Sequence, residues 1–591
     1  MIWLATFAFV AVTGYVCFRT DWVAPAYETL VNVFSFPAST LVRIRRPSQE
    51  WLLLIHGRVL LVTACVLMLS WKWWRHATRW LWFAIWTAYL LRALVWGIGG
   101  NLPMVQGDSA HHFSIARRVM EGHGPTLPYV HSFIRVYSDF GLVDDWSPPA
   151  YAYWLAFAMH FFGATITVAK TATLIINLAT IPILFHLAQR KFDTRIALLS
   201  AWTLALLPAH VLYAAFMLKE SLVCFLTVLA CHLFLWLWED TNRRPLLSAI
   251  AAGIAAGLLC LSRQTGFAID AAMMWFGLWS SVPSKLMRMT FFLLAFSAVI
   301  SPWGWATYRD YGTPFYSSTN SFRYMTSSPD HFVQRGAPTL DDYLKQPISQ
   351  IVRDKLIMLW IIVSYYWFVF TPALALGFTS AVRDWRNNSL ARLCFWVFAA
   401  FVAGTLVNIA AIDQVKDFGR YFLPVLAIMI PAAWHGIVRF LSQFHTDEKN
   451  NTALTSVVIV VVASGLWSGL EWTHNYRFLS EPWHEQLVLQ QKISDKIVRE
   501  LPQDAVVMTY YPWELHMYSQ RKAVLMPRNF DPKRLRQEAN EYGVTHIVLE
   551  SGFGNRKLLA ILQEFGYETR LAEIGNELAN EQIGVYPIRP N

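Results

Sequence analysis

Long apolar windows recur along most of this 591-residue chain, and they constrain its fold more than any other feature. Windows of about 18 apolar residues or more are long enough to cross a bilayer as helices. The composition agrees, because only 15% of the residues are charged, against roughly 25% in soluble domains. We expect an α-helical polytopic membrane protein with about thirteen transmembrane helices. The expected spans are residues 1–18, 51–71, 79–99, 165–187, 196–216, 219–238, 245–262, 264–282, 289–307, 355–378, 390–412, 419–440 and 452–471.

The basic connections between these spans predict the orientation. Lys and Arg clusters fall on one side by count, and cytoplasmic loops carry such an excess, which also accounts for the net charge of +10. A cytoplasmic (inner) membrane protein with its outer loops at 100–164 and 308–354, and with everything after 472 outside, is therefore expected. The topology of residues 1–78 stays open, because a basic RIRR segment lands outside if 51–71 spans. The basic connections are residues 72–79, 189–195, 242–244, 284–288 and 383–392.

Residues 472–591 change composition and predict a small α/β domain. Short apolar stretches typical of strands alternate with segments typical of helices that are each followed by a glycine. The domain contains no Gly-rich phosphate loop, so nothing in it indicates nucleotide binding. The expected strands are 504–513, 544–551 and 581–588, and the expected helices are 531–543 and 555–567.

The first outer loop opens with an unusual polar segment, GDSAHHFSIARRVMEGHG, at residues 107–124. Gly107 breaks the preceding apolar run and Asp108 is a good N-cap, which predicts a helix over about 109–121. One interpretation is structural: a capped amphipathic helix on the outer membrane face. The other is functional: Asp108 lies in a partly desolvated cleft that raises its pKa, so that it can act as a base. His111 and His112, three and four residues on, are then candidate substrate contacts.

Further outer corners also place ionisable residues beside apolar runs. Lys219 and Glu220, in LKES, are functional candidates because such groups are costly at membrane depth, although a helix N-terminus also favours a glutamate. Arg263, in LSRQTG, either snorkels to lipid headgroups or binds a phosphate through its bidentate fork. Arg420 opens the span 419–440, and a local ion pair with Asp417 is its structural alternative. Two carboxylates and several cations on one predicted face favour a functional site.

The order of these segments resembles that of the polytopic C-type glycosyltransferases. The similar segments are GDSAHHFSIARRVMEGHG, SPPAYAYWLAFAMHFFG, LKES, LSRQTG, SPWGWATYRDYGTPF and RYFLP. Those most similar are the bacterial relatives of dolichyl-phosphate-mannose protein mannosyltransferases and the lipid A aminoarabinose transferase, over about residues 79–440. The resemblance implies a C-type glycosyltransferase membrane domain at 79–471. Extra transmembrane segments at 1–78 precede it, and the α/β domain at 472–591 is then extracytoplasmic.

The resemblance also implies roles for the two outer acids. In that family an acid in the first outer loop is catalytic, and Asp108 matches its place. Glu220 matches a second acid at the next outer corner. Many members carry a glutamate directly after the first acid, where this chain has Ser109. A shared metal site is therefore not implied, and a divalent metal stays open as a cofactor.

The residues fit the reaction that the resemblance implies. The family's donors are sugars on a polyprenyl phosphate, and phosphate leaves without needing a proton. The reaction then needs a base for the acceptor hydroxyl and cations for the departing phosphate. We assign Asp108 as general base, Glu220 as an orienting group, and Arg263, Arg420 and Lys219 to the donor phosphate. The implied partners are the donor, membrane lipids and a lipid, glycan or protein acceptor, with no nucleic acid.

The alternative class is a secondary transporter or a flippase-like membrane protein for glycolipids. Transporters place coupling carboxylates near the bilayer midplane and commonly show repeated halves. This chain shows no internal repeat, and its candidate charges gather at the outer face. Both observations favour the enzyme.

Overall fold

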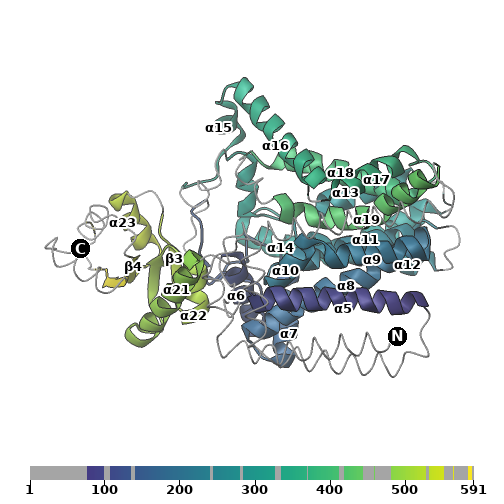
Figure 1. Ribbon diagram of the computed structural model, residues 1–591. Coiled ribbons are helices and arrows are strands. Elements are labelled where there is room, and N and C mark those ends of the chain that lie inside the picture. Colours follow the sequence, from purple (N-terminus) through teal and green to yellow (C-terminus); the bar gives the residue numbers. More distant parts are fainter. Residues whose placement is uncertain are drawn as a thin grey trace, which may run out of the picture.

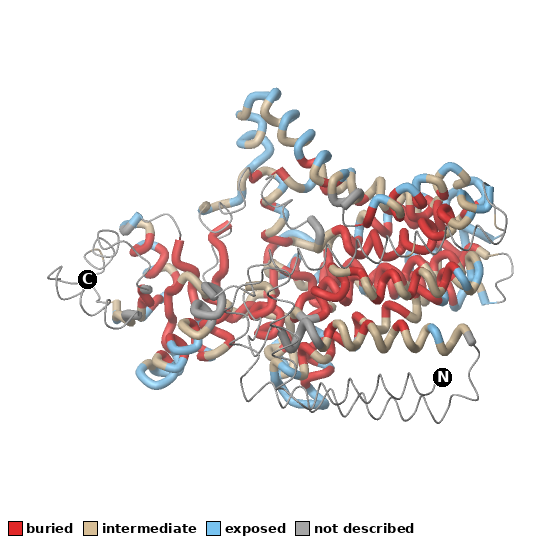
Figure 2. Tube along the Cα trace, viewed as in Figure 1, coloured by how far each residue is buried: buried red, intermediate tan, exposed pale blue. Residues whose placement is uncertain are grey.

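The computed structural model of the protein shows a bundle of long helices with a small α/β domain at one end (Figure 1). Buried residues concentrate inside the bundle and in the centre of the α/β domain (Figure 2). The expected spans 1–18 and 51–71 lie outside the described residues, and so do all but one residue each of the expected span 452–471 and the expected helix 555–567. The structure describes residues 76–98, 107–134, 140–239, 244–279, 282, 284–325, 334–368, 370–410, 418–443, 458, 481–527, 531–550, 564 and 583–588.

Small residues let the bundle helices pack closely, as is common in membranes. A Cβ atom at Gly253 of α12 would lie 2.3 Å from the carbonyl oxygen of Phe292 in α14. Gly436 of α19 approaches the backbone of Gly377 in α17 in the same way. The described bundle helices are α5 (His76–Ile98), α8 (Ile166–Lys191), α9 (Thr194–Leu206), α10 (Pro208–Ala215), α11 (Glu220–Leu237), α12 (Pro245–Cys260), α13 (Gly266–Leu278), α14 (Lys285–Tyr311), α16 (Ile348–Phe368), α17 (Pro372–Arg383), α18 (Ser389–Asn408) and α19 (Phe418–Ser442).

Two expected spans are not single helices. Within the described ranges, five helices (α8, α11, α14, α18 and α19) are long and apolar enough to cross a membrane, and α9 with α10 would make a sixth. The expected span 196–216 bends by 55° between α9 and α10, where Pro208 offers no N–H to continue the hydrogen-bond ladder. The expected span 355–378 divides into α16 and α17. The described residues therefore do not establish the expected number of about thirteen spans.

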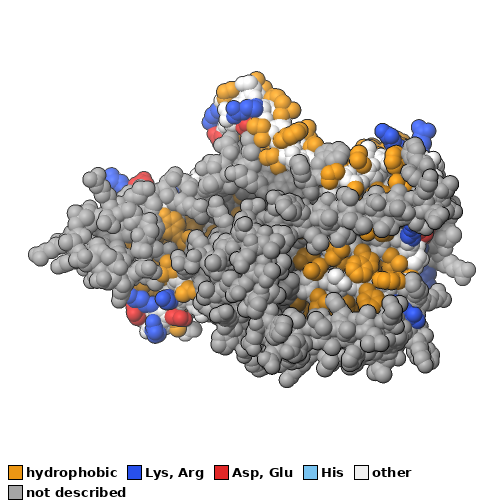
Figure 3. Space-filling view, in the orientation of Figure 1, with side chains coloured by type: hydrophobic (Ala, Val, Ile, Leu, Met, Phe, Trp, Pro, Cys, Tyr) orange, Lys and Arg blue, Asp and Glu red, His pale blue; other side chains and the backbone are white. Residues whose placement is uncertain are grey.

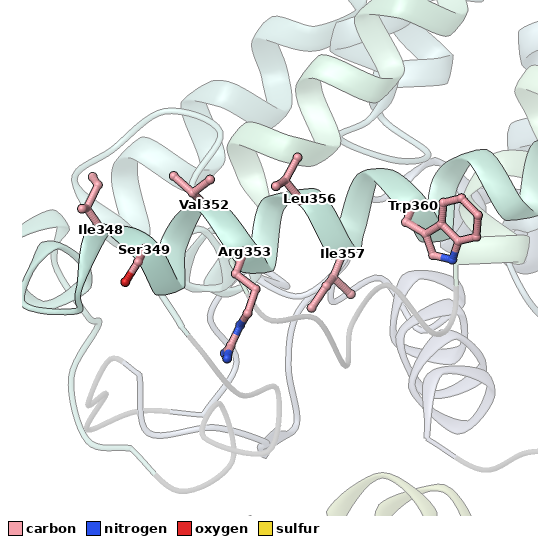
Figure 4. Close-up of a pocket in the computed structure, with 7 residues that line it drawn as sticks. All are labelled: Ile348, Ser349, Val352, Arg353, Leu356, Ile357 and Trp360. Atoms are coloured by element: carbon pink, nitrogen blue, oxygen red, sulfur yellow. The ribbon is translucent and has the colours of Figure 1, made fainter.

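Helix α16 carries apolar side chains along an exposed face. In Figure 4, Ile348, Val352, Leu356 and Trp360 follow one side of the helix at four-residue spacing. Trp360 is 70% exposed. Such a stripe is typical of a helix face that lies against lipid.

The first outer loop contains two short helices that pack against each other and against the bundle. Helix α6 (Asp108–Met120) confirms the helix expected at 109–121, and α7 (Ala150–Phe162) follows the two prolines. The N-cap of α6 is Gly107, with φ 55°, and Asp108 is the first helical residue without a side-chain capping bond. The expectation that Asp108 caps the helix is therefore wrong. The helix is also not a surface helix, because most of its first two turns are buried.

The α/β domain is built around a five-stranded sheet with the order β1-β3-β2-β4-β5. The first four strands are parallel, and β5 pairs antiparallel with β4. The strands are β1 (Tyr129–Val130), β2 (Val506–Thr509), β3 (Lys522–Leu525), β4 (His546–Glu550) and β5 (Ile583–Pro587), and the described helices are α21 (Glu481–Glu500), α22 (Pro512–Ser519) and α23 (Pro532–Glu541).

Several of these elements match the expected α/β pattern. Strands β2, β4 and β5 and helix α23 fall on segments expected from the sequence. The expected strand 504–513 is too long, because Pro512 already begins α22. Strand β3 was not expected, and neither was β1, which comes from the first outer loop.

The two ends of the bundle differ in what they carry. The first outer loop joins the sheet through β1, and Arg335 of the second outer loop pairs with Glu541 of the domain at 2.8 Å. The segments expected outside therefore meet at one end. Figure 3 shows Lys and Arg side chains at the opposite end of the bundle, and others on the α/β domain and at the projecting end of α16. Which end of the bundle faces the cytoplasm therefore stays a prediction.

Candidate active site

Charged residues from four separate corners of the chain meet at the end of the bundle beside the α/β domain. The Arg420 Nη2 donates to Asp108 Oδ2 at 2.5 Å, and Arg420 Nε lies 3.0 Å from Glu220 Oε1. The Arg263 Nη2 lies 3.1 Å from the same Glu220 oxygen. The contacts to Glu220 are ion pairs by distance but are not aligned as hydrogen bonds. Arg420 therefore bridges the two carboxylates that the sequence analysis selected.

The four side chains differ in exposure, and the difference separates their roles. Glu220 is fully buried and Arg263 is 7% exposed, whereas Arg420 and Asp108 are 17% and 22% exposed. Asp108 is thus the carboxylate that a ligand can reach, while Glu220 acts from behind the arginines. Among the described residues, no group of three His, Cys, Asp or Glu side chains is placed to hold a metal ion.

The ionisation of Asp108 differs from the expectation. Burial is the largest single effect and opposes the charged form, but the nearby positive charges, that of Arg420 first, and the hydrogen bond from Arg420 together outweigh it and hold the pKa of Asp108 well below its usual range. The expectation of a raised pKa is therefore wrong. That expectation took account of desolvation in the cleft, but not of the counterion Arg420, which lies 312 residues away in the sequence. The carboxylate is ionised at neutral pH, as a proton acceptor must be, but paired with Arg420 it is a weak base.

Lys219 is a third cation on the same cavity, beside Arg263 and Arg420. Its Nζ donates to the Ser147 hydroxyl at the start of the aromatic segment before α7. Burial, and then the nearby charge of Arg263, lower the pKa of Lys219 to about 8. A hydroxyl does not neutralise an ammonium, so Lys219 would gain from an anionic ligand.

Tyr421 supports both arginines from one side. The Arg263 guanidinium carbon lies 4.2 Å from the centre of the Tyr421 ring, and that of Arg420 lies 5.4 Å from it. Both distances are within cation–π range. The sequence showed Tyr421 only as the residue after Arg420, so its contact with Arg263 could not be anticipated.

These side chains open onto a pocket of about 560 Å³, within the range of pockets that bind small molecules. Its lining combines charged side chains, polar and aromatic side chains, and apolar or small residues of α13 and α18. This mixture fits a ligand with a charged head and an apolar part. Besides the residues already discussed, the lining includes Trp146, Pro148, Gln264, Phe267, Phe315, Thr319, Asn320, Phe322, Arg323, Phe401, Gly404, Thr405 and Asn408.

The two histidines of the first outer loop are not in the pocket. The His111 Nε2 lies 2.8 Å from Asp144 Oδ2, and its Nδ1 lies 2.7 Å from the Tyr129 hydroxyl, with His111 fully buried. His112 is also buried and packs edge-on against Tyr151. Neither side chain lines the pocket. We therefore correct their assignment as substrate contacts to structural residues.

Three residues of the site were missed by the sequence analysis. The Trp146 indole Nε1 donates to Asp108 Oδ1 at 3.2 Å, and Asp144 accepts the backbone N–H groups of Trp146 and Ser147. Arg323, in the 3-10 helix η2 (Ser318–Arg323), also lines the pocket. For Asp144 and Trp146, the sequence did contain a signal, the pair of acids Asp144 and Asp145 just before two prolines. Arg323 had none, because it lies in a long polar loop.

Comparisons with known proteins relate part of the chain to a described family. Residues 147–305 match the family model described as dolichyl-phosphate-mannose-protein mannosyltransferase. The matched segment includes Lys219, Glu220 and Arg263, whereas Asp108 and Arg420 lie outside it. No curated protein sequence matches the chain significantly.

Solved structures share the fold at low sequence identity. ArnT from Cupriavidus metallidurans bound to undecaprenyl phosphate has a TM-score of 0.53 and 13% identity, covering 85% of this chain and 98% of that chain. The archaeal oligosaccharyltransferase AglB from Archaeoglobus fulgidus, in complex with an inhibitory peptide and a dolichol-phosphate, has a TM-score of 0.55 and 15% identity, covering 83% and 71%. These likenesses are of fold. Together with the family match, they confirm the resemblance to the polytopic C-type glycosyltransferases.

Proposed function

We propose that this protein is a membrane glycosyltransferase that moves a sugar from a polyprenyl-phosphate donor to a hydroxyl acceptor on a lipid, a surface glycan or a protein. The observation that carries the proposal is Arg420 bridging Asp108 and Glu220 at the wall of a pocket beside an apolar bundle. A base for a hydroxyl and cations for a phosphate are what this reaction needs. The lipid-phosphate ligands of ArnT and AglB support a lipid-linked donor here. We place the pocket at the outer face of the cytoplasmic membrane.

The proposed reaction is a displacement at the anomeric carbon of the donor sugar. Asp108 takes the proton of the acceptor hydroxyl, and the hydroxyl oxygen forms the new bond to the anomeric carbon. The bond from that carbon to the phosphate oxygen breaks, and its electron pair stays on the phosphate. The leaving group is then the polyprenyl phosphate itself, so no general acid is needed.

Arg420 links donor binding to the basicity of Asp108 in this proposal. A donor phosphate near Lys219 competes with Asp108 for the Arg420 guanidinium, which forms strong bidentate bonds to phosphate. As Arg420 turns to the phosphate, Asp108 loses the charge that lowers its pKa and becomes a stronger base. Glu220 keeps Arg420 and Arg263 in place from behind.

The test is release of polyprenyl phosphate by purified protein in nanodiscs. A panel of polyprenyl-phosphate hexoses and pentoses would be offered with a membrane-lipid and glycan extract as acceptor. Asp108→Asn should lower the rate by about 10²- to 10⁴-fold, because the amide cannot take the proton. Asp341→Asn, a change at an exposed acid of α15 (Leu340–Leu344), is the matched control and should keep the parent rate.

Two results would count against the proposal. Equal rates for Asp108→Asn and Asp341→Asn would remove Asp108 from the chemistry. Translocation of intact labelled glycolipid across proteoliposomes, with no release of polyprenyl phosphate from any donor, would favour the transporter instead.

A further inference from the structure

The first outer loop and the α/β domain are packed together through a shared sheet and a helix contact. Strand β1 of that loop pairs with β3, with Tyr129 opposite Ala523 and Val130 opposite Val524. Helix α22 of the domain packs against α6, which Figure 1 shows as neighbours. The helix that carries Asp108 is therefore held between the membrane bundle and the α/β domain.

One contact from α22 lies directly before Asp108. Glu514 Oε1 accepts the backbone N–H of Gly107 at 2.7 Å, across 407 residues of chain. Glu514 is 1% exposed, and burial in a low-dielectric interior strengthens this hydrogen bond. Gly107 has φ 55°, a conformation in which residues other than glycine are rare, and it is the N-cap of α6. A negative charge beside this helix N-terminus is also favourable.

A chain of hydrogen bonds forms a second connection, starting at β1. The Tyr129 hydroxyl lies 2.7 Å from His111 Nδ1, and His111 Nε2 lies 2.8 Å from Asp144 Oδ2. The other oxygen of Asp144 accepts the backbone N–H groups of Trp146 at 2.9 Å and Ser147 at 3.3 Å. Tyr129, His111 and Asp144 are each at most 3% exposed, so these bonds are shielded from water.

Trp146 and Ser147, which end this series of hydrogen bonds, both contact charged groups of the candidate site. The Trp146 indole Nε1 donates to Asp108 Oδ1, and the Ser147 hydroxyl accepts from Lys219 Nζ. The sheet of the α/β domain is thus connected, bond by bond, to Asp108 and Lys219. The Glu514 contact reaches the same α6 terminus by a separate route.

We propose that the α/β domain is a positioning element of the active site, in which Glu514 holds the first turn of α6 and thereby sets the Asp108 carboxylate. The proposal rests on the function proposed above. Glu514 does not line the pocket, so it acts through Gly107 and is a positioning residue. A misplacement of a reacting group by about 1 Å can cost about 10²-fold in rate.

The test compares three variants at position 514 with a matched control in the same domain. Glu514→Ala removes the acceptor, Glu514→Gln keeps an acceptor oxygen at the same place, and Glu514→Asp keeps the charge but is one methylene shorter. The control is Glu500→Ala at the exposed end of α21. We expect kcat to fall by about 10²-fold in Glu514→Ala with the donor KM of the control, and to return within a few-fold in Glu514→Gln.

A second readout does not require turnover. Hydrogen exchange of the peptide covering residues 107–112 should be about tenfold faster or more in Glu514→Ala than in Glu500→Ala, because the Gly107 N–H loses its partner. If the parent transfers no sugar but this difference is present, the positioning is supported and the proposed function fails. If the parent transfers sugar and Glu514→Ala equals Glu500→Ala in kcat and exchange, the positioning proposal is overturned.

A folding defect in Glu514→Ala would not prevent a decision. The comparison then passes to Glu514→Gln and Glu514→Asp. A kcat for Glu514→Asp well below that of Glu514→Gln, at equal melting temperature, supports the inference, because reach and not charge then matters. Equal kcat values for the two variants overturn it.

Discussion

Removing Arg420 should destabilise the protein mainly through Glu220. Arg420→Ala deletes the guanidinium that two carboxylates share. Asp108 is 22% exposed and water can replace its lost partner, so its share is at most about 1 kcal/mol. Glu220 is fully buried and cannot recruit water. Among the described residues, the ion-pair partner that Glu220 keeps is Arg263, at 3.1 Å.

The geometry sets the expected magnitude. Removing one partner of a buried ion pair costs about 3–5 kcal/mol. Because Arg263 remains and the contact to Glu220 lacks hydrogen-bond alignment, we expect the lower end, about 3 kcal/mol. Adding Glu220→Gln to Arg420→Ala removes the uncompensated charge and should restore about 2 kcal/mol.

The assay is a double-mutant cycle of unfolding free energies, from reversible SDS titration in mixed micelles followed by tryptophan fluorescence. Arg353→Ala is the matched control, because the Arg353 side chain is 67% exposed and paired with Asp354 at the surface. It should stay within about 0.5 kcal/mol of the parent. The reasoning is refuted if Arg420→Ala behaves like the control, or if Glu220→Gln adds its own loss without any recovery.

Three further outcomes are expected. Since burial and then Arg263 lower the pKa of Lys219 to about 8, donor affinity should be present below that pH and fall as the pH rises through it, so that the donor KM rises. Lys219→Arg should move this rise in the KM-against-pH profile to higher pH. Arg323→Ala should raise the donor or acceptor KM without changing the melting temperature, because the only partner that the described residues offer its guanidinium is the Asn408 amide oxygen. Unchanged KM values for both substrates would remove Arg323 from the binding site. A membrane-impermeant thiol reagent should label Gln503→Cys, at an exposed position before β2, in intact spheroplasts; labelling only after lysis would reverse the topology.

The sequence alone determined the features that depend on neighbouring residues. Apolar windows predicted the long helices, the polar segment after Gly107 predicted α6, and alternating short segments predicted β2, β4, β5 and α23. Helix and strand formation follow periodicity and end signals within a few residues, which can be read along the chain. The same local signals located Asp108, Glu220, Arg263 and Arg420 at helix ends on one predicted face.

Only the tertiary structure decided which of these residues meet and what each contact does. It paired Arg420 with Asp108 and Glu220, which reversed the expected direction of the Asp108 pKa. It moved His111 from the pocket to a buried chain of hydrogen bonds, and it joined a two-residue strand of the first outer loop to a domain nearly 400 residues further along. The physical reason is that charge interactions and sheet pairing depend on distance through space, which helix packing sets and local sequence does not encode.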